Sequence, residues 1–230
     1  MSLKPTKKSD LNKDWLRGRD ARAKKVRMNP QYQLIVTEGI KTEPKYFKAI
    51  RDEINREFKD RISLDIEGIG DSTVNLFYRA KGIVEKSRNG YKHVWIVYDT
   101  DDFPPEHINQ TVELCKSEST QETEYHAIWS NQCIELWFLL HFAYYQSDIH
   151  RSEYWPKLTE YLMQMHAGAY KKNRDDMYEL LKPNIDQAIR NAKKLAKVNT
   201  GKTPALSAPG TMVYEIIEKL KPYLKTVQST

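Results

Sequence analysis

The stretch "VWIVYDTDDF" (Val94–Phe103) sets an apolar run directly against a cluster of acids. A short apolar run that ends in polar residues predicts a strand buried in a layered core. Asp99, Asp101 and Asp102 follow this run within four positions. Two unit charges about 4 Å apart repel by roughly 4 kcal/mol at an effective dielectric near 20. Acids crowded at a strand end therefore indicate a site that holds a cation.

On both sides of this stretch, strand patterns alternate with helical spacing. Strands are expected over 32–37, 62–69 and 124–130, and helices over 41–58, 71–88, 104–118 and 131–145. Thr42 is expected to cap the first helix, and Asp71 or Ser72 the second. Strands that alternate with helices predict parallel pairing through crossovers, so residues 29–145 are expected to form an α/β domain with a mostly parallel sheet flanked by helices.

The two ends of the chain have different patterns. Beyond residue 145 the spacing is wholly helical, over 151–166, 175–197 and 209–224, with "NTGKTPALSAPG" as a connector. Residues 146–230 are therefore expected to form a helical extension packed on the α/β domain. Residues 1–28 contain few large apolar residues and no sustained period, which predicts a basic, flexible segment.

The net charge of +6 is unevenly distributed: residues 1–28 carry +7, residues 29–169 carry −7 and residues 170–230 carry +6. Lys and Arg side chains that contact phosphates supply most nonspecific affinity for nucleic acid. An acidic centre between basic ends therefore favours a metal site whose flanks attract a polyanion, although basic segments are often only solvated tails. The candidate nucleic-acid-binding residues are Lys24, Lys25, Arg27, Lys171, Lys172 and Arg174.

Other features bound the class of protein. No stretch approaches the roughly 20 apolar residues of a membrane helix, and the N-terminal segment is charged rather than built like a signal peptide, so a cytoplasmic location is expected. Cys115 and Cys133 lack the paired spacing of a zinc site and are interpreted as free thiols. His126 and His141 are expected to be core residues.

The main candidate site combines two strand ends. Glu38 follows "LIVT" and precedes Gly39, which is expected to let the backbone turn sharply away. If the first and third strands are neighbours, Glu38, Asp99 and Asp101 meet at the carboxyl edge of the sheet, where open α/β sheets bind ligands. Hard oxygen ligands suit Mg²⁺, and Mn²⁺ is the alternative metal for the same site. The competing interpretation is that Asp101 or Asp102 caps the helix near Pro104.

Five segments carry a family resemblance: "LIVTEGIKTEPKYF", "VWIVYDTDDF", "SNQCIELWFLLHF", "AYKKN" and "APGTMVYEIIEKL". Over about residues 30–220 the chain resembles the RloB family of Toprim-related proteins. The resemblance implies a Mg²⁺-dependent nuclease of the Toprim type in phage defence by abortive infection, beside a partner ATPase. By position, it implies Glu38 as a general base or metal ligand, Asp99 and Asp101 as metal ligands, and Glu135 of "ELW" as a further ligand.

Lys171 of "AYKKN" is a candidate for stabilising charge on a leaving oxygen, although an exposed lysine is usually only solvated. Two other functions stay open. One is a noncatalytic Toprim-like module that engages nucleic acid or an ATPase. The other is a phosphoacceptor receiver domain, which is disfavoured because receivers pair acids after the first strand, whereas here "TEG" follows the first strand and "DTDD" the third.

Overall fold

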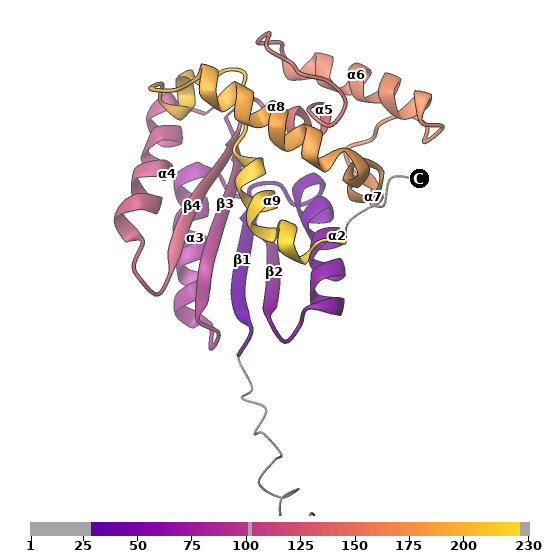
Figure 1. The fold of residues 1–230 in the computed structure, drawn as a ribbon. Helices are drawn as coiled ribbons and strands as arrows, with labels where there is room; N and C mark the ends of the chain where they lie inside the picture. Colours follow the sequence, from indigo (N-terminus) through magenta and orange to yellow (C-terminus); the bar gives the residue numbers. More distant parts are fainter. Residues whose placement is uncertain (1–28, 101–102, 226–230) are drawn as a thin grey trace, which may run out of the picture.

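A four-stranded sheet lies between two layers of helices in the computed structural model, which describes residues 29–100 and 103–225 (Figure 1). The strands are β1 (Gln31–Thr37), β2 (Ile62–Gly68), β3 (Tyr91–Asp99) and β4 (Glu124–Ser130). Their order is β2-β1-β3-β4, and each neighbouring pair is parallel. The predicted α/β class is confirmed, and β1 and β3 are neighbours.

Three helices connect the strands: α2 (Thr42–Glu57), α3 (Thr73–Lys86) and α4 (Pro105–Glu118). The later helices are α5 (Glu135–Leu139), α6 (Arg151–Gln164), α7 (Met177–Leu181), α8 (Ile185–Val198) and α9 (Val213–Leu220). Short 3₁₀ turns follow α7 at Lys182–Asn184, precede α9 at Pro204–Leu206, and follow it at Lys221–Tyr223. Among the described residues, no helix is long and apolar enough to cross a bilayer.

Three of the expected helices differ from those observed. The helix expected over 209–224 is shortened to α9 and the 3₁₀ turn that follows it. The helix expected over 131–145 is reduced to α5, because α8 supplies donors to the backbone that follows it: Asn191 Nδ2 donates to the Leu140 carbonyl at 2.8 Å, and Gln187 Nε2 to the Phe142 carbonyl at 2.9 Å. The helix expected over 175–197 is interrupted by a 3₁₀ turn at Pro183, which has no backbone N–H to donate.

The two faces of the sheet bury different layers. Along β1, Leu34 and Val36 pack with α3 and α4, whereas Ile35 packs with α2 and the C-terminal helices, since successive side chains point to opposite faces. The larger core cluster contains buried residues from α2, α5, α6, α7, α8 and α9 together. An antiparallel bridge between Ser130 and Thr211 also joins the end of β4 to the segment before α9. The helices after residue 145 therefore share one core with the sheet.

Candidate active site

Glu38 and Asp99 meet at the carboxyl edge of the sheet. Glu38 comes directly after β1 and Asp99 is the last residue of β3. The Glu38 N–H donates to the Val97 carbonyl at 2.9 Å, which continues the pairing of the two strands. The Asp99 N–H in turn donates to Glu38 Oε2 at 3.2 Å. Neighbouring parallel strands thus bring the two predicted acids together.

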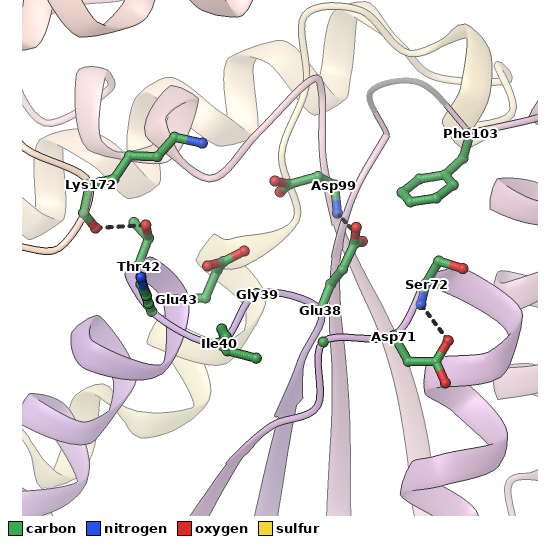
Figure 2. Close-up of a pocket in the computed structure, with 12 residues that line it drawn as sticks. Glu38, Gly39, Ile40, Thr42, Glu43, Asp71, Ser72, Asp99, Phe103 and Lys172 are labelled. Carbon is green, nitrogen blue, oxygen red and sulfur yellow. Dashed lines mark hydrogen bonds between the residues drawn. The ribbon is translucent and has the colours of Figure 1, made fainter.

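Both acids line a cleft of about 480 Å³ at this edge. The loop after β1 and the start of α2 form one wall, and Asp71, Ser72 and Phe103 contribute to another. Figure 2 shows Glu38, Asp99 and Glu43 around the same hollow, with Lys172 above Thr42. Among the residues that the structure describes, four acidic residues, Glu38, Glu43, Asp71 and Asp99, and two lysines, Lys41 and Lys172, therefore line this cleft.

Glu43 was not predicted as a site residue. It lies in the first turn of α2, and only 6% of its surface is exposed. Burial raises the pKa of Glu43, and the negative charge of Glu135 adds to this effect; the backbone N–H groups of Glu43 and Gly39 and the charge of Lys172 oppose it. A buried acid with a raised pKa in a cleft is a common feature of functional sites.

Gly39 is required by the position of Glu43. A Cβ added at Gly39 would lie 2.2 Å from Glu43 Oε2 and 2.6 Å from its Cδ. Gly39 is not among the residues with a left-handed φ, so the expected sharp turn is not what requires glycine. Its missing side chain instead gives the Glu43 carboxylate room beside the end of β1.

Glu135 lies behind the cleft rather than on its lining. Its side chain is buried, and Tyr170 Oη donates to Glu135 Oε1 at 2.8 Å. Burial and the charge of Glu135 both raise the pKa of Tyr170. Burial raises the pKa of Cys133 too, and the charges of Glu135 and Asp99 contribute, which places this thiol near both acids. Glu135 thus belongs to a buried polar group that supports the cleft.

The segment after Tyr170 forms a wall of the cleft through Lys172. Thr42 was predicted to cap α2, but its Oγ1 donates to the Lys172 carbonyl at 2.7 Å, and the cap position falls on Lys41. Lys172 lines the cleft, and its Nζ lies 4.9 Å from the centre of the Trp155 ring. Lys171 is exposed and does not line the cleft. The structure thus brings Lys172, rather than Lys171, to the carboxylates.

The remaining predicted residues have other positions. Arg174 forms a two-point ion pair with Asp176, with bonds of 2.7 and 2.6 Å, and its Nη1 donates to the carbonyls of Ala167 and Ala169. Its guanidinium is therefore occupied within its own loop. The metal-ligand prediction for Asp101, the capping alternative for Asp101 and Asp102, and the nucleic-acid-binding predictions for Lys24, Lys25 and Arg27 all concern residues outside the described ranges.

A comparison with protein-family models identifies the family. A protein-family model described as RloB-like protein matches residues 33–220. The chain belongs to the RloB-like family. The matched residues run from β1 to the end of α9, so the C-terminal helices belong to the family pattern together with the sheet. Searches of curated proteins and of solved structures gave no significant match.

Neither Glu43 nor Lys172 of this RloB-like protein could be identified as a site residue from the sequence. Glu43 stands in "EGIKTEP", five positions after Glu38, but an acid in a first helical turn is usually explained by the helix dipole. Lys172 adjoins Lys171 in "AYKKN", and nothing in the sequence separates two adjacent lysines. Tertiary contacts such as that of Thr42 with the Lys172 carbonyl, 130 positions away, bring Lys172 to the cleft.

Proposed function

We propose that this RloB-like protein is a Mg²⁺-dependent nuclease of the Toprim type. The observation that carries the proposal is the cleft in which Glu38 and Asp99, from adjacent parallel strands, lie with Glu43. Family membership supports a role in phage defence by abortive infection, with an ATPase as partner. Mn²⁺ would be a functional substitute for Mg²⁺.

The donor set fits a hard divalent cation. Carboxylate oxygens are the ligands that Mg²⁺ prefers, and Mg²⁺ binds through few of them and keeps open positions. Glu38 and Asp99 are the proposed ligands, with Asp101 from the same "DTDD" run and Glu43 beside them. Mg²⁺ bound there would polarise a phosphodiester and lower the pKa of the attacking water. Glu38, at the tip of β1, is the proposed acceptor of that water's proton.

The cationic residues have separate proposed roles. Lys172 lines the cleft, so we assign it the stabilisation of negative charge on the scissile phosphate, a role first considered for Lys171. Lys171, exposed on the adjacent surface, would contact a more distant phosphate, as would Lys24, Lys25 and Arg27. Glu135, fixed by Tyr170, would hold the back of the cleft or act as a further ligand.

Nucleic acid is the proposed substrate because of the charge distribution. The acidic central region lies between a +7 segment and a +6 segment, which would contact phosphates on both sides of the cleavage point. Whether the strand is DNA or RNA is decided by experiment.

The test uses the full chain with plasmid DNA, single-stranded DNA, tRNA and total RNA, each with Mg²⁺, Mn²⁺ or EDTA. We expect cleavage of one substrate class that EDTA abolishes and that Glu38→Gln and Asp99→Asn both eliminate. Glu113→Gln is the matched control, since Glu113 lies on the exposed surface of α4. Metal-independent cleavage, or equal activity of Asp99→Asn and Glu113→Gln, would contradict the proposal.

The same experiment separates the enzyme from a noncatalytic module. A protein that binds nucleic acid without cutting any of the four substrates, with or without an ATPase, would be a regulatory module with a Toprim-like fold. Binding is followed by gel shift at several salt concentrations, because phosphate contacts give a steep salt dependence.

A further inference from the structure

A second group of potential metal ligands lies far from Glu38 and Asp99. His93 is near the start of β3, and Glu124 and His126 are at the start of β4. In the β3–β4 register, His93 pairs with Glu124 and Trp95 with His126. Residues two apart on a strand point to the same face, and a strand rises about 3.3 Å per residue. The six positions from His93 to Asp99 therefore separate this group from the cleft by roughly 20 Å.

The three ligand atoms lie close enough together to share one metal ion, at distances that scatter around those of a tetrahedral site. His93 Nδ1 lies 3.1 Å from His126 Nε2 and 3.4 Å from Glu124 Oε2, and the distance from His126 Nε2 to Glu124 Oε2 is 3.9 Å. Zinc bonds of about 2.0–2.2 Å in a tetrahedral site place ligand atoms about 3.3–3.6 Å apart. We propose that His93, Glu124 and His126 bind a zinc-type transition-metal ion.

The chemistry of this donor set differs from that of the cleft. Imidazole nitrogens suit zinc and its neighbours, whereas an all-carboxylate set suits magnesium. Burial is the main cause that lowers the pKa of His93 to about 4, and burial also lowers the pKa of His126. A metal would be bound by His93 Nδ1 and His126 Nε2, the two ring nitrogens that face each other.

Neighbouring side chains hold the ligands in place. The His126 ring stacks on Trp95 with centroids 4.1 Å apart, and Trp95 Nε1 donates to Gln33 Oε1 at 3.0 Å. Lys92 Nζ pairs with Glu124 Oε1 at 2.8 Å, so that Oε2 is the oxygen near the two rings.

The site is open to solvent on one side. His93 is buried, but the side chains of His126 and Glu124 are 26% and 40% exposed, so an ion can enter and a fourth position faces water. Three protein ligands with an open fourth position are typical of zinc sites that do chemistry. Lys219 of α9 lowers the pKa of both histidines through its positive charge, and the same charge weakens cation binding.

The test is a Co²⁺ titration of the full-length protein after EDTA treatment and dialysis, followed by displacement with Zn²⁺. We expect the visible absorption of tetrahedral Co²⁺, lost on addition of Zn²⁺. His126→Gln should weaken binding more than about 100-fold, since even residues that only support metal ligands are worth 10–100-fold. His107→Gln, an exposed histidine on α4, is the matched control and should bind as wild type does. Glu38→Gln should also keep the absorption, which separates this site from the cleft.

Two results would overturn the proposal: wild-type protein without tetrahedral Co²⁺ absorption, or His126→Gln with wild-type affinity. Thermal melts of metal-free proteins check folding of each variant. If His126→Gln is unfolded, Glu124→Gln replaces it, because it keeps the side chain's shape at a position with 40% exposure. It should lose the same affinity, and unchanged binding would reject the site.

Discussion

The two ends of the strands in the sheet collect different side chains, although β3 contributes to both. At the carboxyl edge, Glu38 and Asp99 meet with Glu43 and Lys172 in a cleft. Toward the other edge, β3 and β4 bring His93 together with Glu124 and His126. The carboxyl edge offers hard oxygens, whereas the amino edge offers imidazoles with one oxygen. The cleft depends on where β1 and β3 end, whereas the second group depends on the register of β3 with β4. The two sites therefore arise independently, so a metal bound at one need not affect the other.

The largest expected effects test whether the two sites are independent, with one variant that removes each site. Asp99→Asn should reduce Mg²⁺-dependent cleavage by more than about 100-fold, because the loss of a metal ligand exceeds the 10–100-fold cost of losing a supporting residue. It should leave Co²⁺ binding at His93 and His126 unchanged. His126→Gln should do the reverse. Rates of substrate cleavage and Co²⁺ titrations on both variants check this, and a variant that lost both properties would show that the edges are coupled.

The next effect concerns packing in the cleft. Gly39→Ala should lower the free energy of unfolding by about 1–2 kcal/mol, because the new Cβ forces the Glu43 carboxylate away, although this carboxylate is the flexible end of its side chain. Cleavage should fall as well. The matched control is Gly82→Ala: an added Cβ has open space around it within α3, and alanine favours a helix interior by up to about 1 kcal/mol. Urea melts measure both changes, and equal stabilities of the two variants would contradict the assigned role of Gly39.

Variants of the adjacent residues Lys171 and Lys172 test which lysine stabilises charge in the cleft. Lys172→Gln should reduce kcat about tenfold, which corresponds to about 1.4 kcal/mol of lost charge stabilisation. Lys171→Gln should leave kcat unchanged and only reduce the salt dependence of nucleic-acid binding slightly. Steady-state kinetics and gel shifts distinguish them. A larger loss of kcat in Lys171→Gln would restore the role first considered for that residue.

The smallest effect is a pH dependence. Because the folded protein raises the pKa of Glu43 above 4.5, stability from this group is complete below pH 4.5 and is lost as pH rises through the raised value. In EDTA, Glu43→Gln should therefore melt a few degrees above wild type at pH 8, and the gap should close toward pH 4. Mg²⁺ should stabilise wild type more than the variant. Thermal melts across this range, with and without Mg²⁺, check it, and a gap independent of pH would contradict burial as its cause.

At the carboxyl edge, the sequence predicts those site residues that lie directly at the ends of strands. Glu38 and Asp99 could be placed together because apolar runs mark the strands, and parallel strands end at one edge. Glu43 could not, since its burial depends on the missing side chain of Gly39. The prediction that Thr42 caps α2 was wrong. Its hydroxyl donates instead to the Lys172 carbonyl, and this tertiary contact overrides the local preference.

The group of His93, Glu124 and His126 could not be predicted from the sequence, for a different reason. His126 was expected to be a core residue, and its contact with His93 depends on how β3 and β4 are aligned, which a sequence does not state. A shift of one residue in that register would turn the His126 ring to the opposite face. The short α5 has a similar cause, because the Asn191 and Gln187 amides that bond the backbone after it arrive from α8.

The contacts of α2 with the segment after Tyr170 have a consequence for how the protein can be divided. Thr42 bonds the Lys172 carbonyl, and Lys45 Nζ donates to the Asn173 carbonyl at 2.6 Å. A fragment that stopped at residue 145 would keep the strands, Glu38 and Asp99, but it would lack Lys172 and the Tyr170 hydroxyl that donates to Glu135. The boundary between sheet and helical extension is thus a boundary of secondary structure only: the smallest piece that carries the whole cleft spans both.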